Sequence, residues 1–220
     1  MAGLLVLAGL SMGYAAENEN PSHHVRGRTF QVTITNLTRG QIISPPIVFS
    51  HTRHFSLFEL GQPSSDALAM LAEDGATGPL ESELLASPKV FSVAAATGGI
   101  PPGQSVTVEI NAGGPFGYIS TAGMLVSTND AFFAVRNLRV PFGFGKTSHV
   151  AEAYDAGSEN NSEECEFIPG PPCGNGGVRD TAGAEGYVHI HAGIHGIGDL
   201  FPEDADWRNP VALVVVKAVR

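Results

Sequence analysis

The chain has 220 residues, of which 43% are hydrophobic and only 15% are charged, and its formal net charge is −10. The apolar content is enough for a buried core, which excludes a disordered chain, and the acidic balance disfavours nucleic acid as a partner because like charges repel. The 27 glycines and 15 prolines do not follow a collagen-like period, so they indicate many turns. A cation is the partner that suits this charge.

The first sixteen residues, MAGLLVLAGLSMGYAA, carry no charged side chain. Their apolar run, 4–10, is too short to span a bilayer but matches the central region of a secretory signal, and 13–15 (GYA) is a small-x-small cleavage site. We therefore predict a signal peptide at 1–15, a flexible N-terminal segment at 16–28 and one domain at 29–220. A buried N-terminal strand or helix is the alternative. The prediction implies an exported protein, periplasmic or at the cell surface, with no transmembrane segment after cleavage.

Strand patterns dominate the rest of the chain. In the segment 29–37, the apolar residues Phe30, Val32 and Ile34 alternate with polar ones, which is the period of a half-buried strand. Five further segments are strand candidates: 105–110, 118–127, 132–140, 187–191 and 211–219. Short strands separated by turn-rich segments predict an all-β fold, an antiparallel β-sandwich.

Helical signal is confined to two short insertions, 64–75 and 79–86. Ser64 or Ser65 could cap the first of them, and Gly75 could terminate it.

Two cysteines, Cys165 and Cys173, lie eight residues apart in the turn-rich segment 155–185. Export makes a disulfide their expected state. A metal-binding or catalytic role is disfavoured because there is no third cysteine and the nearest histidine in sequence, His149, is distant.

Three carboxylates stand where they could bind calcium, which takes six to eight oxygen ligands. Asp130 lies at the mouth of a strand, Asp155 opens a loop that contains Gly157, and Glu109 is the one charged residue of its strand. Each also has a simpler interpretation: a solvent-facing strand residue for Glu109, an Asn-Asp turn for Asp130, and an Asx turn with Gly157 for Asp155. The two turn interpretations are compatible with metal binding, because Asx turns pre-position carboxylates.

Three of the eight histidines, His189, His191 and His195, lie close together in HIHAGIH. On a strand, His189 and His191 would point to the same face, and His195 would return after a glycine turn. This spacing could hold zinc or copper through imidazole nitrogens. Alternatively, His195 forms a hydrogen bond with the backbone.

Catalysis finds little support in the sequence. It has no dinucleotide-binding Gly-x-Gly-x-x-Gly, no phosphate-binding loop and no His-Glu-x-x-His. The acidic pairs Glu163/Glu164 and Glu203/Asp204 fall in loops, where a solvated surface is the default interpretation. We predict a binding or adhesion module and not an enzyme.

Three blocks of the chain resemble the spondin N-terminal domain family (F-spondin/mindin type), which also includes exported bacterial proteins. They are SPKVFSVAAATGGIPPGQSVTVEI at 87–110, MLVSTNDAFFAVRNLRV at 124–140 and AYDAGSENN at 153–161. The order Tyr-Asp-Ala-Gly in the third block is the most specific of these features. The resemblance extends over 30–219.

This resemblance implies a C2-like antiparallel β-sandwich that holds a calcium ion with acidic side chains in loops at one end. The calcium carboxylates of the family, a glutamate and two aspartates, map onto Glu109, Asp130 and Asp155. The segment around His51 and His54 is similar to a histidine-bearing segment of the family, which implies a structural role for both.

The sequence therefore predicts an exported calcium-binding sandwich that acts as a surface or extracellular binding or adhesion module. Its expected partner is a surface glycan, a protein or an envelope component. The alternative is a periplasmic or surface copper- or zinc-binding protein that uses His189, His191 and His195.

Overall fold

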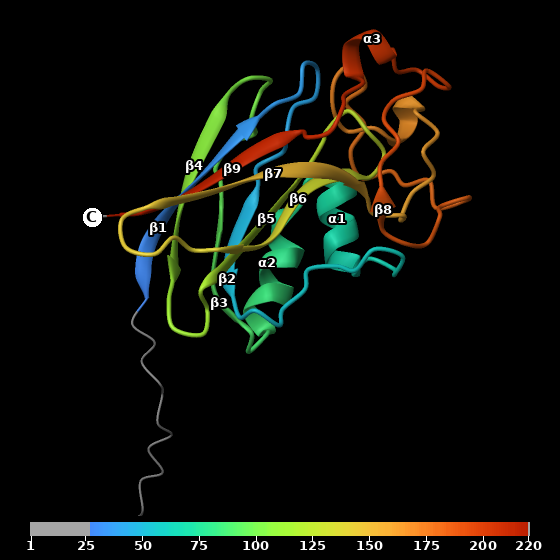
Figure 1. Ribbon diagram of the computed structural model, residues 1–220. Helices are drawn as coiled ribbons and strands as arrows, with labels where there is room; N and C mark the ends of the chain where they lie inside the picture. The colour runs from blue at the N-terminus through green and yellow to red at the C-terminus, as the bar shows by residue number, and fades with distance from the viewer. Residues whose placement is uncertain (1–26, 220) are drawn as a thin grey trace, which may run out of the picture.

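The structure is a computed structural model that describes residues 27–219. Within this range, nine strands form an antiparallel sheet in the order β3-β2-β5-β6-β7-β9-β1-β4, and β8 pairs with β7 (Figure 1). The strands are β1 (Arg28–Asn36), β2 (Ile47–His51), β3 (Val90–Ala95), β4 (Ser105–Ala112), β5 (Tyr118–Met124), β6 (Ala131–Arg139), β7 (Lys146–Asp155), β8 (His189–Ile190) and β9 (Ala212–Ala218). The helices are α1 (Asp66–Asp74), α2 (Thr77–Ala86), α3 (Pro202–Ala205) and the 3₁₀ turn η1 (Cys165–Phe167). This is the predicted all-β class with short helical insertions.

Strand β7 belongs to both halves of the sandwich. Its residues 146–151 pair with β9, and its residues 152–155 pair with β6. One half therefore contains β4, β1 and β9, and the other contains β3, β2, β5 and β6. Because β3 and β4 also contact each other, the sheet curls until it is nearly a barrel.

The first half has one buried and one solvent-facing surface, as the alternation of β1 predicts. Phe30, Val32 and Ile34 are buried in the core, where they join the buried residues of β4 and β9. The polar residues of β1 face solvent and pair with polar residues of β4; for example, the hydroxyl oxygens of Thr33 and Thr107 are 2.8 Å apart. Hydrophobic burial on one face thus sets the register of this half.

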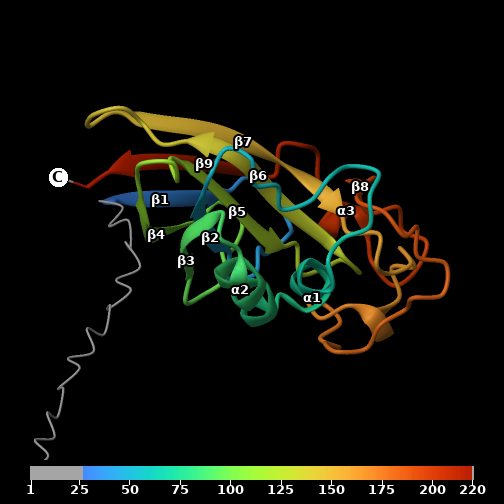
Figure 2. The same ribbon diagram turned by 90° about the horizontal axis from the view of Figure 1, so that it is seen from below.

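In the second half, β2 and most of β5 are buried on both faces because α1 and α2 pack against the outer surface (Figure 2), whereas the edge strand β3 is half-buried. All five residues of β2 are buried, and Phe49 of this strand shares a hydrophobic cluster with Leu68 and Leu71 of α1. Helix α1 begins after Ser65, whose hydroxyl accepts a hydrogen bond from the Leu68 N–H, and ends at Gly75 with φ +68°. Both helix boundaries agree with the sequence prediction.

Five of the six predicted strands are confirmed as β1, β4, β5, β6 and β9, and the candidate 187–191 shortens to β8. Strands β2, β3 and β7 were not predicted from the sequence. Strand β2 shows no alternation because both of its faces are covered. Strand β7 begins with the polar run Lys-Thr-Ser-His, which shows no alternation of apolar and polar residues. It is a strand because it pairs with β9 along its first part and with β6 along its second.

The predicted signal peptide, and the N-terminal segment as far as residue 26, lie outside the described residues. In the range 27–219, no helix is both long and apolar enough to cross a membrane.

Residues 155–206, which we call the acidic loop region, carry eleven Asp and Glu against a single arginine. Their formal charge of −10 equals that of the whole chain, so the remainder is balanced. The region contains little regular structure, and it gathers at one end of the sandwich together with β8 and α3 (Figure 1). A disulfide between Cys165 and Cys173, with Cα atoms 4.9 Å apart, closes a short loop within it, as the sequence predicted.

Candidate metal centre

Two aspartates meet where β6 begins and β7 ends. Ala131 pairs with Asp155 across the two antiparallel strands, so Asp130, the residue before β6, lies beside the last residue of β7. Both aspartate residues are fully buried. The pairing of β6 and β7 thus places two carboxylates close together inside the protein.

The carboxylate of Asp155 forms the expected Asx turn. Its Oδ1 accepts a hydrogen bond from the Gly157 N–H (2.7 Å), and its Oδ2 accepts one from Asn161 Nδ2 (2.7 Å). Gly157 has φ +66°, and a Cβ at this position would lie 2.3 Å from the carbonyl oxygen of Tyr187. Glycine is therefore required here, and its absence of a side chain lets the segment 185–189 approach Asp155.

The carboxylate of Asp130 is only half satisfied. Its Oδ2 accepts hydrogen bonds from the N–H groups of Ser158 (2.7 Å) and Glu159 (3.0 Å) and from the Ser158 hydroxyl (3.1 Å). Its Oδ1 is buried and has no hydrogen-bond partner within residues 27–219. Glu159 Oε2 is in the same condition, although its Oε1 accepts a bond from the Asp180 N–H (2.9 Å). Buried polar atoms normally have a hydrogen-bond or metal partner, so these two oxygens could each accept a further ligand.

Burial of several carboxylates together makes their ionised forms unfavourable. Burial, and then the charge of Asp155, raises the pKa of Asp130 to about 7. Burial, followed by the charges of Glu73 and Asp130, raises the pKa of Glu159 to about 8. Burial also raises the pKa of Asp155.

Among the Lys and Arg of residues 27–219, only Arg179 pairs with this group of carboxylates, and its Nε lies 2.5 Å from Glu73 Oε2. A bound cation would relieve the repulsion among the remaining carboxylates.

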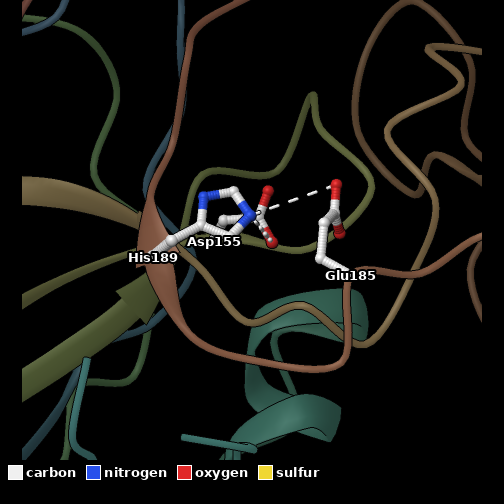
Figure 3. A group of neighbouring side chains, drawn as sticks. All are labelled: Asp155, Glu185 and His189. Atoms are coloured by element: carbon white, nitrogen blue, oxygen red, sulfur yellow. Dashed lines mark ion pairs between the residues drawn. The ribbon is translucent and has the colours of Figure 1, made fainter. Parts of the chain in front are cut away.

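His189 and Glu185 extend the group on the other side of Asp155 (Figure 3). One ligand atom from each of Asp155, Glu185 and His189 lies within 4.8 Å of the other two. His189 Nε2 lies 3.6 Å from Asp155 Oδ1 and 4.0 Å from Glu185 Oε1. These three residues could hold a metal ion.

The hydrogen bonding of the His189 ring leaves a lone pair directed at the carboxylates. Its Nδ1 lies 3.0 Å from the carbonyl oxygen of Ile190, which can only accept, so Nδ1 carries a proton. Nε2 is buried and has no hydrogen-bond partner in the described part of the chain. In the neutral ring, its lone pair therefore faces two carboxylate oxygens, an arrangement that either a proton or a metal ion would stabilise.

The other two histidines of the predicted cluster have different surroundings. His191 uses both ring nitrogens: Nδ1 accepts from the Gly193 N–H (2.9 Å), and Nε2 donates to Asn161 Oδ1 (3.1 Å). Burial, and then His189 and His195, lowers the pKa of His191 to about 4, so this ring is neutral. His195 is exposed, and its backbone N–H donates a hydrogen bond to the carboxylate of Glu163. His191 Nε2 also lies 3.9 Å from Asp155 Oδ2, so the structure brings both His189 and His191 to the carboxylates. Of these two, however, only His189 has a ring nitrogen without a hydrogen-bond partner in the described part of the chain.

Glu109 does not join the predicted calcium ligands. It faces solvent on β4, where its Oε1 accepts a hydrogen bond from Gln31 Nε2 (3.2 Å). Across the sheet it aligns with Gln31, Lys217 and Lys146 in turn. Lys146 begins β7 and Asp155 ends it, which separates the two positions by about 30 Å along the strand. The expected grouping of Glu109 with Asp130 and Asp155 is wrong, and the simpler interpretation of a solvent-facing strand residue is correct.

The predicted solvated surface at Glu163/Glu164 is wrong for Glu163, which is buried. Its carboxylate accepts hydrogen bonds from the N–H groups of His195 (2.6 Å), Gly196 (2.7 Å) and Ile197 (3.0 Å). This carboxylate therefore organises the turn that follows β8. Its neighbour Glu164 is exposed, as expected.

The sequence interpretation missed Glu159 and Glu185, and it did not connect His189 with the carboxylates. No spacing in the sequence indicates these contacts, and those of Glu185 and His189 depend on the close approach of Tyr187 to Gly157. No model of a known protein family matches this chain, and neither does any curated protein.

Proposed function

We propose that the protein is an exported module that binds a divalent cation, with calcium as the first candidate, and uses the ordered loops around it to bind a surface partner. The observation that supports this most is the buried, unpartnered Oδ1 of Asp130 beside the carboxylate of Asp155. Calcium prefers carboxylate and carbonyl oxygens, and Glu159 and Glu185 supply further carboxylates nearby. The resemblance to the spondin family points to the same two aspartates.

The location of the cluster connects cation binding to partner binding. Asp155, Glu159 and Glu185 belong to the acidic loop region, whose backbone is folded around them. A cation that neutralises these side chains would hold the loops in one arrangement, and loops on a rigid sandwich are common binding surfaces. The partner that we propose is a surface glycan, a protein or an envelope component. The apolar run 4–10 and the disulfide are compatible with export.

Metal analysis and thermal unfolding test this proposal. Protein purified without added ions should contain calcium, chelation should lower the Tm, and added calcium should restore it. A ligand that binds only the native state stabilises it by about 2.7 kcal/mol at a hundredfold excess over its Kd. Asp130→Asn and Asp155→Asn should each weaken the response to calcium.

The matched control is Glu203→Gln, which changes an exposed carboxylate of α3 and should leave the response intact. If calcium does not change the unfolding of the wild-type protein, the calcium proposal is wrong.

A copper or zinc site is the second candidate, and the lone pair of His189 favours it. These metals accept imidazole nitrogen together with carboxylate oxygen, as Asp155, Glu185 and His189 would provide. Stoichiometric zinc or copper in the purified protein, lost in His189→Gln, would favour this site. The same variant should change calcium binding much less than Asp130→Asn does.

A further inference from the structure

The turn between β6 and β7, residues 140–145 (VPFGFG), exposes two phenylalanine rings. Phe142 is 102% exposed and Phe144 is 65% exposed. Gly143, between them, has φ +66°, and the Gly145 N–H donates to the carbonyl oxygen of Phe142 (3.4 Å). This tight backbone, which we call the aromatic turn, holds both rings outside the sandwich.

Arg28, the first residue of β1, supports the aromatic turn. Its Nη1 donates to the carbonyl oxygen of Gly143 (3.2 Å), and its guanidinium lies 5.2 Å from the centre of the Phe144 ring. The same guanidinium lies 5.9 Å from the ring of Phe30, which is buried in the core. The turn is thus attached to the sandwich by a hydrogen bond and by cation–π contacts.

Basic side chains surround the aromatic turn. His51, Tyr118 and Arg139 align across β2, β5 and β6, so the ends of these strands lie at the same end of the sandwich as the turn. Six of the ten Lys and Arg within residues 27–219 are exposed at this end: Arg28, Arg53, Lys89, Arg139, Lys146 and Lys217. The segment 139–149 contains no Asp or Glu. Glu109, in register with Lys217 and Lys146, is also exposed at this end, so six cationic side chains surround one carboxylate there and the end carries a net positive charge.

A groove of about 630 Å³ adjoins the aromatic turn, between it and the turn that connects β4 to β5. Arg139 and Phe142 both line it, together with Tyr118. A cation and an apolar ring on one concave surface suit a phosphate headgroup with its adjoining hydrocarbon.

We propose that the aromatic turn binds an anionic lipid surface. Phe142 and Phe144 enter the boundary between headgroups and acyl chains, and the surrounding Lys and Arg contact lipid phosphates. A second copy of this chain is a poorer occupant, because a symmetric dimer would place the two basic ends against each other.

Vesicle flotation with the full chain tests the proposal. The protein should float with vesicles that contain phosphatidylglycerol and much less with vesicles of phosphatidylcholine alone. The double variant Phe142→Ser/Phe144→Ser should weaken binding at least about tenfold, because two apolar rings no longer leave water. Lys146→Glu should weaken binding to the anionic vesicles alone. The matched control, Ile197→Ser/Phe201→Ser, removes apolar side chains that are 70% and 62% exposed in the acidic loop region and should bind as the wild type does.

A fluorescence measurement reports on the turn itself. In Phe142→Trp, the introduced indole should shift its emission to the blue when anionic vesicles are added. The native Trp207 is 7% exposed and lies at the edge of the acidic loop region, so it should not respond. Three results would overturn the proposal: no flotation of the wild type, full flotation of the double serine variant, or a wild-type dimer that this variant dissociates while neither binds lipid.

Discussion

The acidic loop region and the aromatic turn differ in what they bury and what they expose. At the first, Asp130 and Asp155 are fully buried, and oxygens of Asp130 and Glu159 have no hydrogen-bond partner within residues 27–219. At the second, Phe142 and Phe144 stand in solvent among cationic side chains. Charged side chains are usually exposed and apolar ones buried, so each region contains the kind of side chain expected in the other environment. Each end therefore suits a different partner: the buried carboxylates suit a cation, and the exposed rings among cationic side chains suit an apolar, anionic surface.

The largest effect should come from exchanging a buried phenylalanine for alanine. Phe132 is fully buried next to the start of β6, and Phe132→Ala should lower the free energy of unfolding by about 3–5 kcal/mol. Phe142→Ala at the aromatic turn should change it by less than about 0.5 kcal/mol, because the ring is already in water. Denaturant unfolding measures both. A large loss in Phe142→Ala would mean that the turn contributes to the fold and is not a binding element.

The disulfide in the acidic loop region should have the next largest effect. Cys165→Ser/Cys173→Ser should lower the free energy of unfolding by about 2–3 kcal/mol, since the cross-link no longer restricts the unfolded chain. Unfolding measured with and without reductant checks this value. Vesicle binding should be unaffected, and a parallel loss of it would contradict the independence of the two ends.

Asp130→Asn should have opposite effects with and without a cation. In chelator at pH 8, it should raise the free energy of unfolding by about 1–2 kcal/mol, because it removes a buried charge that repels Asp155. The gain should vanish near pH 4: folding raises the pKa of Asp130 from its ordinary value of 3.8 to about 7, so the penalty builds up as pH rises between these two values and is absent below the lower one.

Unfolding curves in chelator at the two pH values measure this change, and Asp204→Asn on the exposed α3 serves as the control. Destabilisation by Asp130→Asn at pH 8 would show instead that its hydrogen bonds outweigh the repulsion.

The smallest effect concerns His51, which is buried near the basic end. Its Nε2 lies 2.7 Å from Ser120 Oγ, and burial lowers its pKa below the ordinary value of 6.5. The unfolded chain therefore takes up a proton near pH 6.5 that the folded protein does not, so the stability contributed by neutral His51 is present above this pH and falls below it. His51→Gln should flatten this part of the pH profile in thermal unfolding. An unchanged profile would show that His51 does not titrate differently in the two states.

Much of the fold could be predicted because its signals are local. The alternation of Phe30, Val32 and Ile34 identifies β1, and Ser65 and Gly75 mark the ends of α1. Strand β2 could not be predicted in this way, because helices that follow it in sequence cover its outer face and remove its alternation. The pairing of β7 with two neighbours is likewise a property of the assembled sheet.

The candidate site was predictable in part for a similar reason. Asp130 and Asp155 adjoin the paired ends of neighbouring strands, so strand pairing brings them together. Glu109 was misplaced because a lone carboxylate on a strand looks the same whether it faces solvent or a metal. Glu185 and His189 come within reach only where the chain passes Gly157, and no pattern of residues encodes that contact.

Strand β7 also limits how the length of this chain can change. It begins at Lys146 beside the aromatic turn, ends at Asp155 in the candidate metal centre, and changes partner between Ala151 and Glu152. One residue inserted or deleted within it would reverse the inward and outward side chains of one half while the other half kept its register. The turns at either end have no such restriction, so insertions and deletions in this protein should accumulate in the loops and spare the ten residues of β7.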